Sequence, residues 1–559
     1  MRQFWKLTVI ALLIVSVISG CTKEKAAEST KPTVTEQATE VTPDAAKAND
    51  FGWVKPEKTT VIDYYHADQM NPDKTAKKGE KLHAYMLDNF NVDLKQTVFD
   101  IAPMEKLNLM LVSGEYPPVI AAMNDDTISK WQAQGKLLDL APLVDQFGPN
   151  IKKELGSKYN SYLDKDGHLW GLPRGWGLLS IPDQSAHIRW DWYLKMNSPK
   201  IETPDDYYNV LKQMVKEHPT NAKGEKVYAI SWNDQVEIKT VMGMWGLTDQ
   251  HKEDADHNLT HWLNTSEGLE AVKYYNRYFR EGLMDPESFL NKFDDWKNKF
   301  SNERIAGHIG PWWQTINAGD AIWSTSIPNY DENMRYMQIP LKANGVAKAY
   351  LSPKDTTGWN YTVLTDKAKN PEEIIKFLDF EMTPMGTRLM SWGIPNVPET
   401  SLWMHNSDGT WQFNDVQKQR FLTGKFEFDK TDEATGGNVF WLDHPQGAMS
   451  DDNKSTAWYD QNFNDDLKWR KMMNDNMKDT IYDISARRIN FTPDNPLTIK
   501  NQQIEDAIKS GFAKAVMSKT EAESIANFNE LKDKANKLGL VEITKFRTDE
   551  YKKKLEQMK

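Results

Sequence analysis

Cysteine is nearly absent from this sequence: a single one, Cys21, occurs in 559 residues. One thiol excludes an internal disulfide and any zinc site built from several cysteines. Basic residues are outnumbered, because 69 lysines and arginines stand against 80 aspartates and glutamates, for a net charge of −11. An acidic chain is poorly suited to neutralising phosphates, so we expect no nucleic-acid partner. Gly-rich phosphate loops, zinc-protease motifs and Gly-x-Ser-x-Gly elbows are also missing.

Aromatic residues, by contrast, are plentiful. The chain has 21 tryptophans, 20 tyrosines and 21 phenylalanines. Tryptophan is usually much the rarest of the three, so the protein is enriched in large flat side chains. With 39% hydrophobic residues the chain has enough material for a core. Its length corresponds to three or four domains, or to two large lobes.

The first twenty residues have the features of a targeting segment. Arg2 and Lys6 precede a mostly apolar run at 7–18, and Ser19, Gly20 and Cys21 follow it. The run is shorter than the ~20 residues that span a bilayer, and no later run reaches ~18 residues. The order resembles the lipobox of bacterial lipoproteins. We therefore expect a signal peptide at 1–20, lipidation of Cys21, and a disordered tether at 21–50; a buried N-terminal helix is the alternative.

Local patterns after residue 50 alternate between strand and helix. Strands are predicted at 59–65, 116–123 and 186–190, and an Asp-Gly turn predicts a hairpin at 164–173. Helices are predicted at 104–113, 203–217 and 266–281, from residue 370 onward, and over most of the last sixty residues. Short connections between alternating strands and helices predict an α/β fold.

Several segments, taken in order, resemble one known family. They are MLVSGEYPPVI at 110–120, GKLLDL at 135–140, DGHLWGLP at 166–173, HIRWDW at 187–192, YFREGLMDPE at 278–287, NPEEIIKFLDF at 370–380 and WGI at 392–394. They are similar to segments of the extracellular solute-binding proteins, family 1, of bacterial ABC importers, and most of all to the large lipoprotein branch of Gram-positive bacteria. The resemblance covers about residues 50–545.

The resemblance implies a two-lobed fold of the periplasmic-binding-protein type II. We expect one lobe from 51–175 and 308–360 and the other from 176–307 and 361–559, with crossovers near 171–177, 305–310 and 358–361. It further implies capture of an oligosaccharide between the lobes and its delivery to an ABC permease. Catalysis, a cofactor and a metal are not expected. The protein is expected to be a monomer held on the outer face of the membrane by its lipid anchor.

Candidate ligand contacts follow from the chemistry of sugars, whose apolar ring faces stack on aromatic rings while their hydroxyls bind polar groups. Asp125 follows a predicted strand, where α/β sheets bind ligands, although helix capping is an alternative role in this stretch. Arg174 follows a Gly-Leu-Pro segment and is a candidate for hydroxyls or a carboxylate, with a salt bridge as its alternative. Five indoles in predicted loops, each alternatively a core residue, complete the set: Trp176, Trp312, Trp313, Trp359 and Trp392.

Three segments match metal sites only in part. Many family members have a calcium-like loop where this chain reads HPTNAKGEK at 218–226, and one carboxylate with two lysines does not supply enough oxygen ligands. Asp164 and Asp166 fit a turn better than a calcium loop. A patch rich in histidine and acids is interpreted as a solvated loop, with a metal site as the alternative: His251, Glu253, Asp254, Asp256, His257 and His261.

Two other classes of protein remain open on sequence alone. A cell-surface glycoside hydrolase or lyase has the same aromatic and acidic content, and the distance between two acids that its mechanism requires is not readable from sequence. A structural cell-surface module without a small ligand is the third possibility.

Overall fold

The computed structural model separates the chain into two units, residues 1–46 and 47–559. The structure describes residues 48–559 except 68–71, 98–102, 165, 175–183, 235, 237, 329, 356, 359, 398–399, 409, 418–467, 490, 492–494 and 559, and it leaves a few further side chains undescribed. The predicted signal peptide, Cys21 and nearly all of the predicted tether lie outside the described residues.

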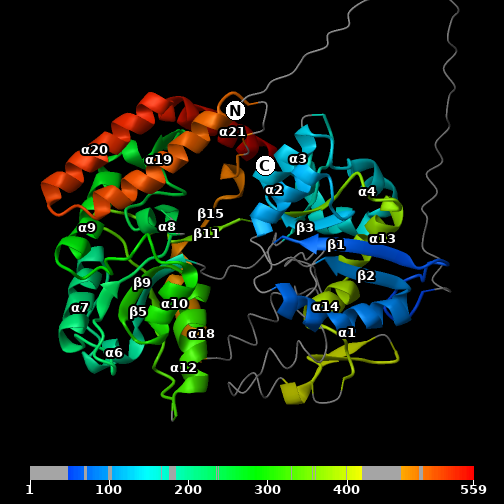
Figure 1. Ribbon diagram of the computed structural model, residues 1–559, viewed down its shortest axis with the longest axis horizontal. Helices are drawn as coiled ribbons and strands as arrows, with labels where there is room; N and C mark the ends of the chain where they lie inside the picture. Colours follow the sequence, from blue (N-terminus) through cyan, green and yellow to red (C-terminus); the bar gives the residue numbers. More distant parts are fainter. Residues whose placement is uncertain are drawn as a thin grey trace, which may run out of the picture. The chain divides into compact units, whose positions relative to one another are not determined.

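A five-stranded sheet has the order β2-β1-β3-β12-β4. Its strands are β1 (Thr60–His66), β2 (Val92–Thr97), β3 (Val119–Met123), β4 (Leu172–Arg174) and β12 (Asn360–Leu364). Of these, β1, β2 and β3 are labelled in Figure 1. Strands β2, β1 and β3 are parallel, and β12 runs antiparallel to both β3 and β4. The predicted strands at 59–65 and 116–123 are confirmed, and β3 is buried along its whole length, as an apolar run in a central strand covered on both faces should be.

Helices and a small hairpin complete this first lobe. They are α1 (Pro72–Phe90), α2 (Pro103–Ser113), α3 (Asp125–Ala133), α4 (Ala141–Phe147), α5 (Pro149–Leu155), α13 (Pro371–Glu381), α14 (Pro384–Trp392), β13 (Trp403–His405) and β14 (Trp411–Phe413). One hydrophobic core joins the sheet to most of these elements through residues such as Ile62, Phe90, Leu364 and Phe377, and a second, smaller cluster joins it to α2 and α3.

A second sheet of four strands has the order β10-β5-β9-β6. Its strands are β5 (Gln184–Arg189), β6 (Tyr228–Ile230), β9 (Ile305–Pro311) and β10 (Tyr336–Ile339). Strand β5 is antiparallel to β9 and β10, and β6 is parallel to β9. Two short strands, β11 (Ser352–Lys354) and β15 (Ile481–Asp483), pair with each other in parallel.

Helices of the second lobe bury two further hydrophobic clusters, one large and one small. These helices include α6 (Trp190–Lys195), α7 (Pro204–Glu217), α8 (Ile238–Gly243), α9 (Ser266–Arg280), α10 (Phe293–Ser301), α11 (Trp312–Thr315), α12 (Ala321–Ser326) and α18 (Lys468–Met477). Helix α7 begins at a complete capping box between Thr203 and Asp206, with Pro204 in the first turn, as its sequence predicts.

The C-terminal helices α19 (Thr498–Val516), α20 (Glu521–Leu538) and α21 (Leu540–Gln557) belong to the second lobe (orange to red in Figure 1). Phe512 of α19 and Phe528 of α20 each contact the ring of Trp262, and all three side chains are buried in the second core. The helical, amphipathic character predicted for the last sixty residues is confirmed.

The predicted division into lobes is wrong for the middle of the chain. Residues 308–360 were expected in the first lobe, but β9 and β10 pair with β5, and Ile309, Met337 and Leu351 are buried in the second core. Residues 360–413 instead complete the first lobe. The cause is physical: strand pairing joins residues far apart in sequence, whereas periodicity reports only local structure. The chain changes sheets between 174 and 184 and between 354 and 360, and not at 305–310, which lie inside β9.

Among the helices of the described residues, none is both long enough and apolar enough to cross a lipid bilayer.

Candidate functional site

Polar side chains gather at one edge of the first sheet. The carboxyl ends of β1, β3 and β4 lie at this edge together with the start of the antiparallel strand β12. Four polar residues lie at this edge, each at the end of a strand, at its start or directly after it: His66, Asn124, Arg174 and Asn360. Ligands of open α/β sheets bind outside the carboxyl ends of the strands, so this edge is the first half of the candidate site.

Arg174 is the central cation of this edge and is only 1% exposed. Its Nη1 donates to Oδ1 of Asn360 at 3.3 Å, and its Nη2 lies 3.1 Å from Nε2 of His66. Because a guanidinium has no acceptor, Nε2 of His66 must accept this bond, which makes the imidazole neutral. Burial, and then the charge of Arg174, lower the pKa of His66 well below its usual value. The predicted ligand residue Arg174 is thus a buried charge held at the strand ends by two neutral groups.

Asp125 lies in the first turn of α3, beside the end of β3. Its carboxylate is 2.7 Å from the guanidinium of Arg488, which also lies 3.4 Å from Asp355 and faces the ring of Tyr361. Burial raises the pKa of Asp355 despite the nearby arginine. A pocket of 390 Å³ is lined by these charged groups, among other residues. The helix cap is made by Asn124, whose side chain accepts from the Thr127 amide at 2.9 Å, so Asp125 does not cap the helix and pairs with Arg488 instead.

The second half of the candidate site is the edge of the other sheet where β9 ends. Pro311 lies opposite Gln184 of β5, and Trp312, half-buried, begins α11 directly after the strand. A Cβ atom on Gly310 would lie 2.4 Å from Nε2 of His308, so this position accepts only glycine without displacement. Trp312 therefore stands at the end of a strand, although its segment is a short helix and not the predicted loop.

Two buried histidines hold the turn that carries Trp312. Nε2 of His187 donates to the carbonyl oxygen of Gly310 at 3.0 Å, and its Nδ1 lies 3.2 Å from Oγ1 of Thr315. Nε2 of His308 lies 3.0 Å from Oε1 of Gln314. Burial lowers the pKa of His187 to about 3 and that of His308 to about 4, so both are neutral. The first turn of α11 is therefore fixed by uncharged hydrogen bonds.

The structure describes only some of the five tryptophans that were predicted to contact the ligand. Trp176 and Trp359 lie outside the described residues, and nothing is described of the Trp313 side chain.

Trp392 packs in the core of the first lobe, and its role as a ligand contact stays a prediction. It is 4% exposed, and its ring centroid lies 5.1 Å from that of Phe413 and 5.6 Å from that of Trp411. The hairpin β13–β14 covers it, a contact between segments that local sequence patterns do not predict.

Four residues at or beside this edge were not among the sequence-based candidates: His66, Asn124, Asn360 and Arg488. His66 ends a strand that was predicted, so the strand-end rule that selected Asp125 applies to it equally. Asn360 begins β12 and needs the antiparallel pairing to be placed. Arg488 reaches Asp125 from 363 residues away, and no local pattern marks it.

The segments considered for metals form compact turns. In 218–226, Oδ1 of Asn221 accepts from the amides of Lys223 and Glu225, and Nζ of Lys223 donates to Oδ1 of Asn302 at 2.7 Å. In the other turn, ligand atoms of Asp164, Asp166 and His168 lie within 4.8 Å of one another. Asp164 accepts from the Trp170 indole at 2.8 Å, as expected of a carboxylate that stabilises a turn.

Comparison with known proteins identifies relatives over part of the chain. The fructooligosaccharide ABC transporter substrate-binding protein FusA of Streptococcus pneumoniae is 24% identical over 308 residues, which are 52% of this chain and 55% of FusA. Lipoprotein LipO of Bacillus subtilis is 21% identical over 326 residues, 56% of this chain and 62% of LipO. The chain thus spans little more than half the length of these curated relatives. No family model matches the chain.

Solved structures match over most of the chain. The alginate-binding protein AlgQ2 in a structure without calcium ion has a TM-score of 0.66 and 18% identity, covering 89% of this chain and 99% of that one. An EF-hand mutant of S. pneumoniae FusA in complex with fructo-nystose has a TM-score of 0.65 and 18% identity, covering 88% and 99%. An HMO-binding solute-binding protein from Bifidobacterium longum infantis has a TM-score of 0.62 and 17% identity. The match covers 89% of this chain and 99% of that one. The chain therefore has the two-lobed α/β fold of the solute-binding proteins of ABC transporters, and its resemblance to that family is confirmed.

Proposed function

We propose that this protein is a lipid-anchored extracellular solute-binding protein that captures an oligosaccharide between its lobes and delivers it to an ABC permease. The observation that carries the proposal is the fold, which matches 99% of the length of sugar-binding chains such as FusA with fructo-nystose. Arg174 and Trp312, at the carboxyl ends of strands in the two sheets, supply the groups that sugar recognition needs: donors for hydroxyls and an aromatic face for a ring.

The site is proposed to bind without catalysis. The relatives are binding proteins, and the charged groups next to β3 are engaged with each other: Asp125 and Asp355 both contact Arg488. A pair of acids for glycoside hydrolysis needs one free to donate a proton and one free to act as base or nucleophile. Carboxylates that share one arginine do not provide that division of roles.

The test is a thermal-melting screen of the purified full chain against fructooligosaccharides, alginate fragments and HMOs, followed by an assay for new reducing ends. A ligand that binds the folded state raises the melting temperature by mass action. The proposal predicts a shift with at least one class and no new reducing ends. A shift accompanied by new reducing ends would identify an enzyme, and the absence of any shift would favour a structural module.

A further inference from the structure

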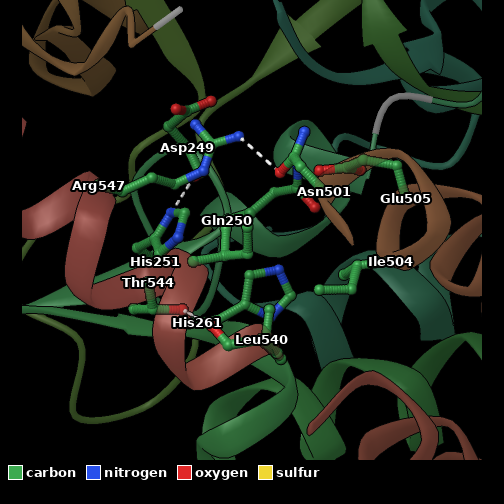
Figure 2. Close-up of a pocket in the computed structure, with 11 residues that line it drawn as sticks. Asp249, Gln250, His251, His261, Asn501, Ile504, Glu505, Leu540, Thr544 and Arg547 are labelled. Atoms are coloured by element: carbon green, nitrogen blue, oxygen red, sulfur yellow. Dashed lines mark hydrogen bonds between the residues drawn. The ribbon is translucent and has the colours of Figure 1, made fainter. Parts of the chain in front are cut away.

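A smaller cavity of 140 Å³ lies in the second lobe, between helices α19 and α21 and the hairpin of β7 (His251–Glu253) and β8 (Leu259–His261). Figure 2 shows Arg547, Asn501 and Glu505 toward the top of the view and the apolar side chains of Ile504 and Leu540 lower down. Nothing in the proposed oligosaccharide site accounts for this cavity.

Two histidines face each other across the hairpin. His251 and His261 occupy directly opposite positions, and their ring centroids are 5.3 Å apart with nearly perpendicular planes. They are 6% and 5% exposed, so the expectation that this segment is a solvated loop is wrong for both. Burial lowers the pKa of His251 to about 4 and that of His261 well below its usual value. Both rings are neutral at ordinary pH.

The hydrogen bonds of the two rings define their free nitrogens. Nδ1 of His251 donates to the carbonyl oxygen of Asp249 at 2.7 Å, which leaves Nε2 as an acceptor. Nδ1 of His261 accepts from the Leu263 amide at 3.3 Å, which places the proton on Nε2. In the described part of the chain, neither Nε2 of His251 nor the buried Oε1 of Gln250 has a hydrogen-bond partner. A buried acceptor without a hydrogen bond costs free energy. These two atoms therefore need a hydrogen-bond donor that the described side chains of the cavity do not supply.

Charged groups of both signs also line the cavity without forming ion pairs. Arg547 donates to Oδ1 of Asn501 at 3.3 Å and lies over the ring of Phe491, and it has no carboxylate partner within the described residues. Asp249 and Glu505 likewise form no ion pair in that part of the molecule. Burial raises the pKa of Glu505, while Arg547 opposes the shift. Within the described residues, the cavity thus places a guanidinium near two carboxyl groups without a direct ion-pair contact between them.

We propose that this cavity binds a small free amino acid, of the size of glycine or alanine, as its zwitterion. The ammonium supplies donors to Nε2 of His251, Oε1 of Gln250 and the carboxyl groups, and the carboxylate binds Arg547 and the Nε2–H of His261. A cavity of about 150 Å³ holds a molecule of some six heavy atoms, which matches this size. Asp249 and Arg547 also line the 390 Å³ pocket beside Asp125, which provides the route of entry. A metal ion fits less well, because Arg547 repels it and Nε2 of His261 carries a proton.

The test is calorimetric titration of the full chain, without any sugar, with glycine, alanine, acetate, methylammonium and Zn²⁺. The proposal predicts saturable binding of glycine or alanine, at least tenfold tighter than that of acetate or methylammonium, because each of these supplies only half of the charges. Saturable binding of Zn²⁺ alone, or of acetate as tightly as glycine, would overturn it. So would the absence of saturable heat, which would leave ordered water as the occupant. None of these outcomes depends on the proposed oligosaccharide function.

Variants locate the binding. Arg547→Gln and Glu505→Gln should each weaken glycine binding at least tenfold, and both side chains are half-buried, so the fold should tolerate the changes. Lys545→Gln is the matched control, since Lys545 is on the same helix, exposed, and paired with Asp549 outside the cavity. His251→Gln, with its melting temperature measured in parallel, tests the imidazole directly. Undiminished glycine binding in both Arg547→Gln and Glu505→Gln would place the amino acid elsewhere and contradict the proposal.

Discussion

The carboxylate of Asp125 and the guanidinium of Arg488 lie 2.7 Å apart, although 363 residues separate them in the sequence. Asp125 belongs to α3 at the strand ends of the first sheet, and Arg488 follows β15, which pairs with β11. The backbone carbonyl of Arg488 is in turn bound by Lys554 of α21. This ion pair therefore connects the C-terminal part of the chain to the edge of the first sheet, where the ligand is proposed to bind.

Replacement of Asp125 by asparagine should lower the free energy of unfolding by about 1–3 kcal/mol, because a partly buried arginine loses its nearest charged partner. Urea denaturation measures the change. Asp126→Asn is the matched control, since Asp126 is the next residue, is exposed, and should change stability by less than about 0.5 kcal/mol. Equal stability of the two variants would show that the ion pair contributes nothing.

Trp312 and Trp392 should respond in opposite ways to replacement by alanine. Trp312 is half-buried at the end of β9, and its loss should weaken oligosaccharide binding by about 1–3 kcal/mol while the protein still folds. Trp392 is buried against Phe413 and Trp411, and its loss should cost about 3–5 kcal/mol of stability.

Calorimetry and melting curves on both variants distinguish the two roles. If Trp392→Ala keeps its stability but loses the ligand, the assignment of the two indoles is reversed. If Trp312→Ala binds with unchanged affinity, Trp312 does not contact the sugar.

Asp320 should make stability depend on pH. It is buried at the end of the π-helical segment η3 (Ile316–Asp320), where its Oδ1 accepts from the Tyr336 amide at 3.1 Å, and burial raises its pKa to about 7. The folded protein therefore binds a proton that the unfolded chain releases near its usual pKa of about 4. Stability from this group is fully present below about pH 4 and is lost as the pH rises to about 7, at roughly 1.4 kcal/mol per pH unit.

The measurement is urea denaturation of wild type and Asp320→Asn across this pH range. The difference in unfolding free energy between them should change in favour of the variant as the pH rises, and it should level off above about pH 7. A difference that is independent of pH would mean that Asp320 titrates normally in the folded protein.

Local patterns predicted the elements well, and their pairing poorly. The N-cap at Thr203 and the buried strand before Asn124 are encoded within a few residues, so the sequence predicts them. The neighbours of β9 and β12, the cover over Trp392 and the contact between Arg488 and Asp125 depend on segments far apart in the chain. The histidines of the β7–β8 hairpin were mistaken for a solvated loop for the same reason, because α19 and α21 bury them from the other end of the sequence.

Cys21 is predicted to be the lipidated anchor, on the basis of the charged start, the apolar run and the Ser-Gly-Cys segment. Cys21→Ser should move the protein from the membrane fraction to the medium and abolish labelling with a fatty-acid analogue. A conservative replacement elsewhere in the tether, Ser29→Thr, is the control and should remain membrane-bound. Membrane retention of the Cys21 variant without lipid label would contradict the lipobox interpretation.

The most direct test of the central claim is amide hydrogen exchange of the full chain with and without a saturating oligosaccharide from the melting screen. Binding between the lobes predicts slower exchange at the strand ends of both sheets, at residues 122–125, 172–174 and 360–362 in the first and 309–315 in the second. Protection confined to one sheet, or absent from these segments while the ligand is bound, would contradict the account.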